Sequence, residues 1–136
     1  MLTGSCLCGA IKYEVSSEIN GFVHCHCHTC RRVHGTVFGS SALVSNEAFK
    51  LITGEDALTC YASSPGKERC FCHRCGSHVF ARITSRPETI ILRIGTLDVD
   101  PGARPEGHIW VSHKASWYEI CDQLPQYEEA MPGKVR

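Results

Sequence analysis

Cys25-His26-Cys27-His28-Thr29-Cys30 places three thiols within six residues, and Cys70-Phe71-Cys72-His73-Arg74-Cys75 repeats the same C-x-C-x-x-C spacing. A shorter pair, Cys6-x-Cys8, lies near the N-terminus. A C-x-x-C turn points both sulfurs at one ion, and on an extended strand residues i and i+2 of C-x-C share a face. Thiolates suit zinc, which takes four ligands in a tetrahedron. These spacings therefore predict zinc sites that join distant parts of the chain.

Length and charge limit the class of protein around these sites. The chain has 136 residues, 43% of them hydrophobic, which is typical of one ordinary domain with its own core. Lys plus Arg and Asp plus Glu both number 14, so the formal net charge is zero. Composition thus gives no electrostatic reason to expect nucleic acid or an anionic membrane as a partner.

The N-terminal stretch from Met1 to Val15 lacks the basic segment and apolar run of a signal peptide. The longest apolar stretch, Ile90-Ile91-Leu92, is far too short to span a bilayer. We therefore expect an intracellular, cytoplasmic location. In that compartment the ten cysteines are expected to be reduced thiols that bind metal, not a disulfide framework.

Alternating apolar and polar residues between frequent turns predict an all-β fold for a single domain over residues 1–136. A helical turn over Thr29–His34, closed by Gly35, is expected after the central cysteines. The polar tail over about 122–136 should wrap the surface or fray. The strand candidates are Ala10–Val15, Val37–Val44, Phe49–Thr53, Leu58–Ala62, Arg69–Cys72, His78–Ile83, Thr89–Gly95 and His108–Val111.

The spacing alone leaves the division of ligands open. In the simplest scheme, one ion is held by four sulfurs, those of Cys6, Cys8, Cys72 and Cys75. A second ion then has three protein ligands and one open position, as in a catalytic site, held by Cys25, Cys27 and Cys30. The alternative closes the second site with Cys70 or with a neighbouring histidine, of which the candidates are His26, His28, His34, His73 and His78.

The other cysteines need no metal. Cys60 shares a strand face with Leu58 and Ala62, so we expect a small buried apolar side chain there. Cys121 is expected to be buried in the same way or to lie exposed without a role. Trp110 and Trp117 are more typical of core or edge-covering side chains than of a binding site.

The order of these motifs resembles the glutathione-dependent formaldehyde-activating enzyme family, which includes centromere protein V and its relatives. The resemblance rests on Gly4-Ser-Cys6-Leu-Cys8-Gly9, the central cysteine motif up to Arg31, Phe71-Cys72-His-Arg-Cys75-Gly76, and His108-Ile-Trp-Val-Ser-His-Lys114-Ala-Ser-Trp117 with Leu124-Pro125-Gln-Tyr127. It implies stacked antiparallel sheets with two zinc ions per chain. It also implies that Cys6, Cys8, Cys72 and Cys75 form the structural site, and that Cys25, Cys27 and Cys30 form the open, catalytic one.

The activity implied by this resemblance is a carbon–sulfur lyase that condenses glutathione with formaldehyde to S-hydroxymethylglutathione. The thiol of glutathione would take the fourth zinc position and lose its proton there. A fourth thiolate adds negative charge, and Arg31 and Arg32 are the nearest cations in sequence, although they could equally be solvated surface charges. The expected partners are thus glutathione and an aldehyde, with no nucleic acid and no membrane, while the oligomeric state is left open.

Two departures from the family pattern bear on the open site. Cys70 adds a thiol that could compete for metal or cap the open position, and His113 and Ser116 lie in a stretch where the family more often reads Ser-Lys-Ala-Pro-Trp. The competing functions are a thiol carrier without catalysis and a structural two-zinc interaction module. The chain lacks the basic extensions that such a module would favour.

Overall fold

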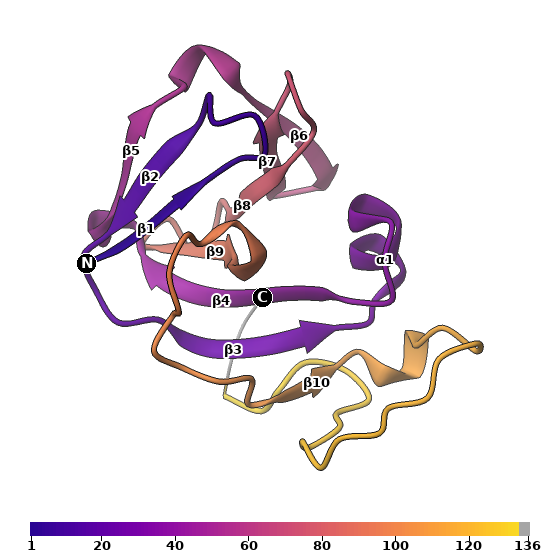
Figure 1. The fold of residues 1–136 in the computed structure, drawn as a ribbon. Coiled ribbons are helices and arrows are strands. Elements are labelled where there is room, and N and C mark those ends of the chain that lie inside the picture. Colours follow the sequence, from indigo (N-terminus) through magenta and orange to yellow (C-terminus); the bar gives the residue numbers. More distant parts are fainter. Residues whose placement is uncertain (134–136) are drawn as a thin grey trace.

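The computed structural model describes residues 1–133 and arranges them as two β-sheets with one short helix, α1 (His28–His34) (Figure 1). The smaller sheet has the strand order β1 (Leu2–Ser5), β2 (Lys12–Val15), β5 (Phe49–Thr53). The larger sheet has the order β10 (Gly107–Ile109), β3 (Asn20–Cys25), β4 (Gly39–Ser45), β9 (Thr89–Arg93), β8 (His78–Ile83), β7 (Lys67–Cys72), β6 (Leu58–Ser64). Short 3₁₀ turns span Asn46–Ala48, Glu55–Ala57, Ile94–Thr96 and Val111–His113. The predicted all-β fold of stacked sheets is confirmed, with one difference: β10 runs parallel to β3.

Two strands, β1 and β3, were not predicted from the sequence. β3 reads Asn-Gly-Phe-Val-His-Cys, and Gly21, Phe22 and Val23 are all buried in succession. A strand covered on both faces has no polar side to alternate with, so the period-two pattern is missing. The predicted strands at Thr89–Gly95 and His108–Val111 end earlier than expected, because each runs into a 3₁₀ turn.

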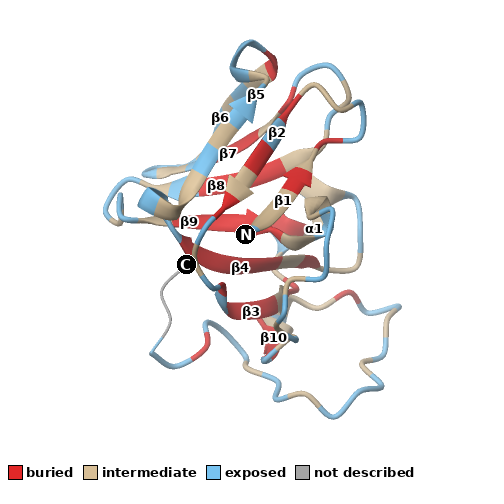
Figure 2. Cartoon of the chain, turned by 60° about the vertical axis from the view of Figure 1, so that its left-hand side comes forward, coloured by how far each residue is buried: buried red, intermediate tan, exposed pale blue. Residues whose placement is uncertain are grey.

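Aromatic rings link the two sheets across the main core. Tyr13 of β2 stacks on Phe49 of β5 with ring centroids 5.2 Å apart, and Phe49 meets Phe80 of β8 edge to face at 5.1 Å. Figure 2 shows the buried residues concentrated along β3, β4 and β9, whereas β5 and β6 are largely exposed. This core fixes how the small sheet lies on the large one.

The two faces of the large sheet have different roles. On β9, Ile90 and Leu92 belong to the main core, whereas Ile91 belongs to a separate cluster on the other face. Arg93 follows Ile91 at a spacing of two, so it shares that second face. On β7, Cys70 belongs to the main core, so Lys67 and Arg69 lie on the second face as well. The strand alternation therefore gathers three cations on the face turned away from the small sheet.

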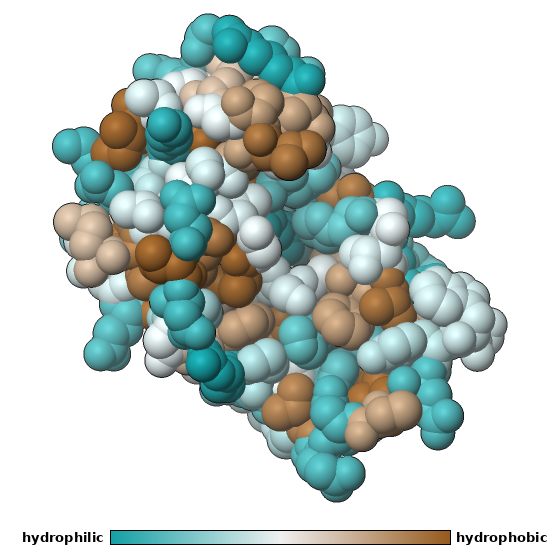
Figure 3. All heavy atoms as spheres, viewed as in Figure 1, coloured by the Kyte–Doolittle hydropathy of each residue, from teal (hydrophilic) through white to brown (hydrophobic). Residues whose placement is uncertain are grey.

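The chain after β10 packs back onto the large sheet. The Tyr127 N–H donates to the His108 carbonyl at 2.9 Å, and Met131 is buried beside Val23 and Ile109. The part of the predicted tail up to Gly133 thus lies against the large sheet, while residues 134–136 lie outside the described residues. Apolar side chains are scattered in small groups among polar ones on the face seen in Figure 3.

The helical turn predicted after the central cysteines is confirmed as α1. Its N-cap is Cys27, and it ends at Gly35, whose backbone is left-handed with φ 60°. Within residues 1–133, no helix has the length and apolar character needed to cross a membrane.

Candidate metal centres

Four cysteine sulfurs meet where the small sheet touches the end of β7. Sγ atoms of Cys6, Cys8, Cys72 and Cys75 all lie within 4.8 Å of one another. Cys6 and Cys8 are 3.6 Å apart, and Cys8 and Cys72 are 3.8 Å apart. Zinc–sulfur bonds of about 2.3 Å place the sulfurs of a tetrahedron ~3.8 Å apart, so this geometry fits a zinc ion.

Two tight turns build this four-cysteine site. In the first, the Gly9 N–H donates to the Cys6 carbonyl at 3.0 Å. In the second, the Gly76 N–H donates to the Cys72 carbonyl at 2.7 Å. Hydrogen bonds from Ser77 lower the pKa of Cys75 to about 5, which favours the thiolate that a metal needs. The first turn is not the extended C-x-C that the sequence suggested, because β1 ends before Cys6, whereas the second is the tight C-x-x-C turn that it suggested.

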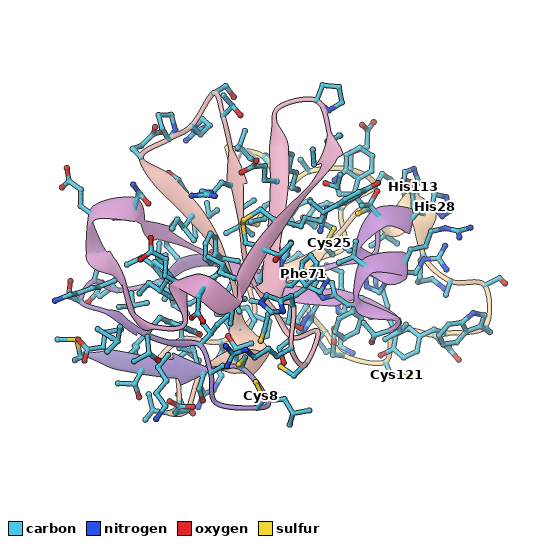
Figure 4. The ribbon with its side chains drawn as sticks, turned by 90° about the horizontal axis from the view of Figure 1, so that it is seen from above. Cys8, Cys25, His28, Phe71, His113 and Cys121 are labelled. Atoms are coloured by element: carbon cyan, nitrogen blue, oxygen red, sulfur yellow. A yellow bond between two sulfur atoms is a disulfide. The ribbon has the colours of Figure 1, made fainter. Side chains whose placement is uncertain are left out.

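Three further cysteines meet at the end of β3. Sγ atoms of Cys25, Cys27 and Cys30 lie within 4.8 Å of one another, and Cys25 and Cys30 are buried. The Cys30 N–H donates to Cys27 Sγ at 3.3 Å, which holds the first turn of α1 around the cluster. Figure 4 shows Cys25 beside α1, well separated from Cys8 in that view. The structure thus brings together both sets of cysteines that the sequence had proposed.

Among residues 1–133, no histidine, aspartate or glutamate joins the three-cysteine cluster within that distance. His26 is fully buried and its Nε2 pairs with His108 Nδ1 at 2.8 Å, while His108 Nε2 pairs with Asp122 at 2.9 Å. His28 stacks on His113, with ring centroids 4.6 Å apart, at the rim of the site (Figure 4). The donor set of this cluster is therefore three thiols, which matches a zinc site with one position left for another ligand.

Cys70 does not cap this site, which corrects one of the sequence alternatives. It forms a disulfide with Cys60, its direct partner across β6 and β7. The expectation that the cysteines are all reduced, and that Cys60 is a buried apolar side chain, was therefore wrong. Register caused the error: the sequence does not show that the hairpin places Cys60 opposite Cys70. The remaining eight cysteines are free thiols, and Cys121 is exposed.

Three cations surround the three-cysteine cluster, and sequence reasoning missed all of them. Arg69 is buried and its Nη1 lies 3.8 Å from Cys30 Sγ. Hydrogen bonds from Cys25 and Cys27, followed by the charges of Arg93 and Arg69, hold the pKa of Cys30 well below its usual range. Burial lowers the pKa of Lys67, the third cation. The available signal in the sequence was strand alternation. Lys67 and Arg69 fall on the opposite face of their strand from Cys70, and Arg93 falls on the opposite face of its strand from Leu92.

Arg31 and Arg32, the cations expected from the sequence, lie elsewhere. Arg31 Nη2 pairs with His28 Nδ1 at 2.9 Å. Both arginines line a separate hollow of about 300 Å³ with Trp117. They follow Cys30 in sequence, but α1 turns their side chains toward its outer surface.

The three-cysteine cluster lies between two spaces. An inner cavity of about 50 Å³ is lined by the cysteines together with Ser41, Lys67, Ile91, Arg93, Ile109 and Trp110. An outer hollow of about 400 Å³ is formed mainly by polar residues, in the set Cys27, His28, Thr29, Ser63, Ser64, Lys67, Arg69, Trp110 and His113. Cys27, Lys67 and Trp110 line both spaces, so the two meet at these side chains. Ser116, the other departure from the family pattern, is exposed and lines neither.

Trp110, which lines both spaces, has an unusual backbone conformation. Its φ of 55° is the one positive value among non-glycine residues in the described chain. This conformation costs a bulky side chain free energy, so the surrounding contacts must maintain it. The Trp110 N–H donates to the Glu129 carbonyl at 3.0 Å, and the Val111 N–H donates to the Tyr127 carbonyl at 3.0 Å. The tail therefore holds the indole between the inner cavity and the outer hollow.

Comparisons with known proteins find relatives over most of the chain. Residues 1–113 match the model of the glutathione-dependent formaldehyde-activating enzyme family. A Halomonas elongata protein named for this enzyme is 33% identical over 129 residues, which cover 88% of this chain and 81% of the relative. An uncharacterized lyase of Schizosaccharomyces pombe is 30% identical over 135 residues, covering 98% of this chain and 96% of the relative. A crystal structure of a Rhodobacter sphaeroides protein superposes with a TM-score of 0.62 at 27% identity, covering 76% of this chain and 97% of that one.

Proposed function

We propose, from the premise that this chain belongs to the glutathione-dependent formaldehyde-activating enzyme family, that it is a zinc-dependent carbon–sulfur lyase. The proposed reaction is the condensation of glutathione with formaldehyde to S-hydroxymethylglutathione. In this proposal Cys25, Cys27 and Cys30 hold the catalytic zinc, and Cys6, Cys8, Cys72 and Cys75 hold the structural one.

One observation carries the proposal: three cysteines, with no fourth ligand among the described residues, lie at the junction of a polar hollow and a small cavity. A closed structural zinc site needs four protein ligands, whereas a catalytic site keeps one position for a reactant. A zinc ion held there would supply a Lewis acid at which an incoming thiol is deprotonated near neutral pH.

The charges of the chain support an anionic fourth ligand. Three thiolates and one divalent ion carry a net charge of −1, and a substrate thiolate would bring it to −2. Lys67, Arg69 and Arg93 surround this position and offset the added charge. Electrostatic interactions are strong here because Arg69 and Arg93 are almost entirely removed from water.

The outer hollow suits a peptide thiol with free carboxylates. Its volume of about 400 Å³ falls in the range of small-molecule sites. Arg69 and Lys67 offer positive charge, and Ser63 and Ser64 offer hydroxyls, on the hairpin between β6 and β7. Glutathione would extend along this hairpin with its sulfur toward Cys27. Held in this way, the thiolate needs only a correctly placed electrophile to react.

The proposal is tested by exchange NMR on glutathione and formaldehyde at equilibrium, with and without the zinc-loaded protein. We expect faster interconversion with S-hydroxymethylglutathione, and loss of that acceleration in Cys27→Ser. Cys121→Ser is the matched control, because Cys121 is exposed and belongs to neither cluster. No acceleration by a protein that holds two zinc ions would reject the lyase and favour a thiol carrier or a structural module.

A further inference from the structure

A buried cation in the inner cavity has unused hydrogen-bonding capacity. Arg93 is 6% exposed, and none of the described residues accepts a hydrogen bond from its Nε or Nη2. Leaving such buried donors without an acceptor is costly, and most buried polar groups in proteins have partners. Arg93 lines the inner cavity with the three cysteines. A guanidinium in this state is suited to an anionic or oxyanionic ligand that enters the cavity.

The size of the cavity limits what that ligand can be. A volume of about 50 Å³ corresponds to roughly three to five water molecules. The metal and the sulfur of a thiol substrate take part of this space. What is left accommodates a carbonyl compound of one carbon, while Ile91 and Ile109 close the cavity with apolar walls. The peptide part of a thiol substrate can fit only in the outer hollow.

We propose that the inner cavity is the aldehyde subsite and that Arg93 is its oxyanion-binding residue. This inference rests on the proposed function and assigns the place of the second reactant. The thiolate sulfur donates an electron pair to the carbonyl carbon, and a carbon–sulfur bond forms. The π electrons of the carbonyl move to its oxygen, which becomes an alkoxide next to the N–H groups of Arg93. The alkoxide then takes a proton from water that enters through the outer hollow. The hydroxide left behind is neutralised by the proton that the thiol released on becoming a thiolate, and the hydroxymethyl thioether is complete.

The sheet explains why Arg93 can serve this step and Arg69 cannot. Arg93 pairs across β9 and β4 with Ser41, and Cys25 ends β3 two residues beyond the partner of Ser41. A side chain on a central strand has little freedom to move, so its donors are preorganised before the charge develops. Arg69 already lies 3.8 Å from the sulfur of Cys30, and it lines the outer hollow rather than the inner cavity.

The first test uses formate, a planar one-carbon anion that resembles the alkoxide in size and charge. Binding is measured by calorimetry on the zinc-loaded protein with glutathione in excess, so that the thiol takes the fourth metal position. We expect wild type and the exposed control Arg104→Met to bind formate equally, and Arg93→Met to bind it at least about tenfold more weakly. Propionate, with two more carbons, should not compete. Equal formate binding by Arg93→Met, or competition by propionate, would overturn the subsite.

The second test follows the reaction with the same variants. Removing one oxyanion donor typically lowers kcat by about 10²–10³-fold, so Arg93→Met should lose far more in kcat than it gains in KM for glutathione, whose charge Lys67 and Arg69 still offset. Arg93→Lys keeps the charge but not the geometry and should recover part of the loss. It also serves as the second variant if Arg93→Met does not fold. A parallel fall in glutathione affinity would make Arg93 a charge-balancing residue only and contradict the assignment.

The two proposals fail in different ways. If wild type accelerates the formaldehyde exchange and Arg93→Met is equally fast, the lyase stands and the aldehyde subsite is wrong. If wild type binds formate as expected but accelerates no exchange, the anion site stands and the lyase is wrong.

Discussion

Individual side chains decide how much negative charge the three-cysteine cluster can tolerate. Arg69 is 2% exposed and Arg93 is 6% exposed, so solvent screens neither charge effectively. Both charges lower the pKa of Cys30, after the hydrogen bonds from Cys25 and Cys27. Arg31, in contrast, pairs with His28 on the outer side of α1. Burial, rather than distance along the sequence, determines which arginine acts on the metal site.

Replacing Arg69 should therefore weaken thiol binding, and replacing Arg31 should not. We expect Arg69→Met to raise the Kd for glutathione by about tenfold or more, since hydrogen bonds to a charged group typically contribute about 1.5–3 kcal/mol. Calorimetric titration of the zinc-loaded proteins measures the difference, with Arg31→Met as the matched control. A larger increase in Kd for Arg31→Met than for Arg69→Met would show that Arg31, on α1, balances the charge instead.

At the scale of elements, β1 and β2 depend on a close approach that only glycine permits. A Cβ at Gly4 would overlap the ring of Tyr13, its partner on β2. Tyr13 cannot move aside, because its ring stacks on Phe49 and its hydroxyl bonds Thr96 Oγ1 at 2.7 Å. The small sheet is thus fitted around one aromatic side chain.

Gly4→Ala should lower the free energy of unfolding by about 1–3 kcal/mol, the usual cost of overpacking a core. Gly95→Ala is the matched control, since a Cβ at Gly95 has open space around it. Denaturant unfolding of both zinc-loaded variants gives the comparison. A Gly4→Ala protein as stable as Gly95→Ala would mean that Tyr13 has room to move.

The β6–β7 hairpin carries a second element-scale feature, the disulfide between Cys60 and Cys70. The same hairpin presents Ser63, Ser64, Lys67 and Arg69 to the outer hollow. A covalent link between opposite residues limits how far the two strands can separate. The hairpin therefore holds the side chains that line the outer hollow in a fixed register.

The disulfide predicts a thiol count. Protein purified without reductant, then denatured and stripped of metal, should show eight reactive thiols by colorimetric titration. Cys60→Ser should raise this count by one because it frees Cys70, whereas Cys121→Ser should lower it by one. A count of ten, the total number of cysteines, would show that the pair is reduced in the purified protein.

At the scale of the whole molecule, the two cysteine clusters have unequal structural roles. The four-cysteine site joins the turn after β1, in the small sheet, to the turn between β7 and β8, in the large sheet. The three-cysteine site is formed by β3 and α1, which are adjacent in sequence. We therefore expect loss of the first site to weaken the contact between the two sheets, and loss of the second to affect one local segment.

Two matched variants should separate these roles. Cys27→Ser should retain one zinc ion per chain and a native circular dichroism spectrum, whereas Cys72→Ser should fail to fold, because structural zinc contributes folding free energy directly. Metal analysis and thermal unfolding measure both effects. Similar behaviour of the two variants would contradict this division between the sites.

The sequence by itself determined the class of fold, most of the strands and the short cysteine motifs from which the two clusters are built. Local periodicity and short spacing carry that information, because a strand alternates every two residues and a chelating turn needs few residues. Only the tertiary structure decided that Cys70 pairs with Cys60, and that Lys67, Arg69 and Arg93 surround the three-cysteine site. Those contacts depend on strand register and on the order of strands in the sheet, which are set by packing between residues far apart in the chain.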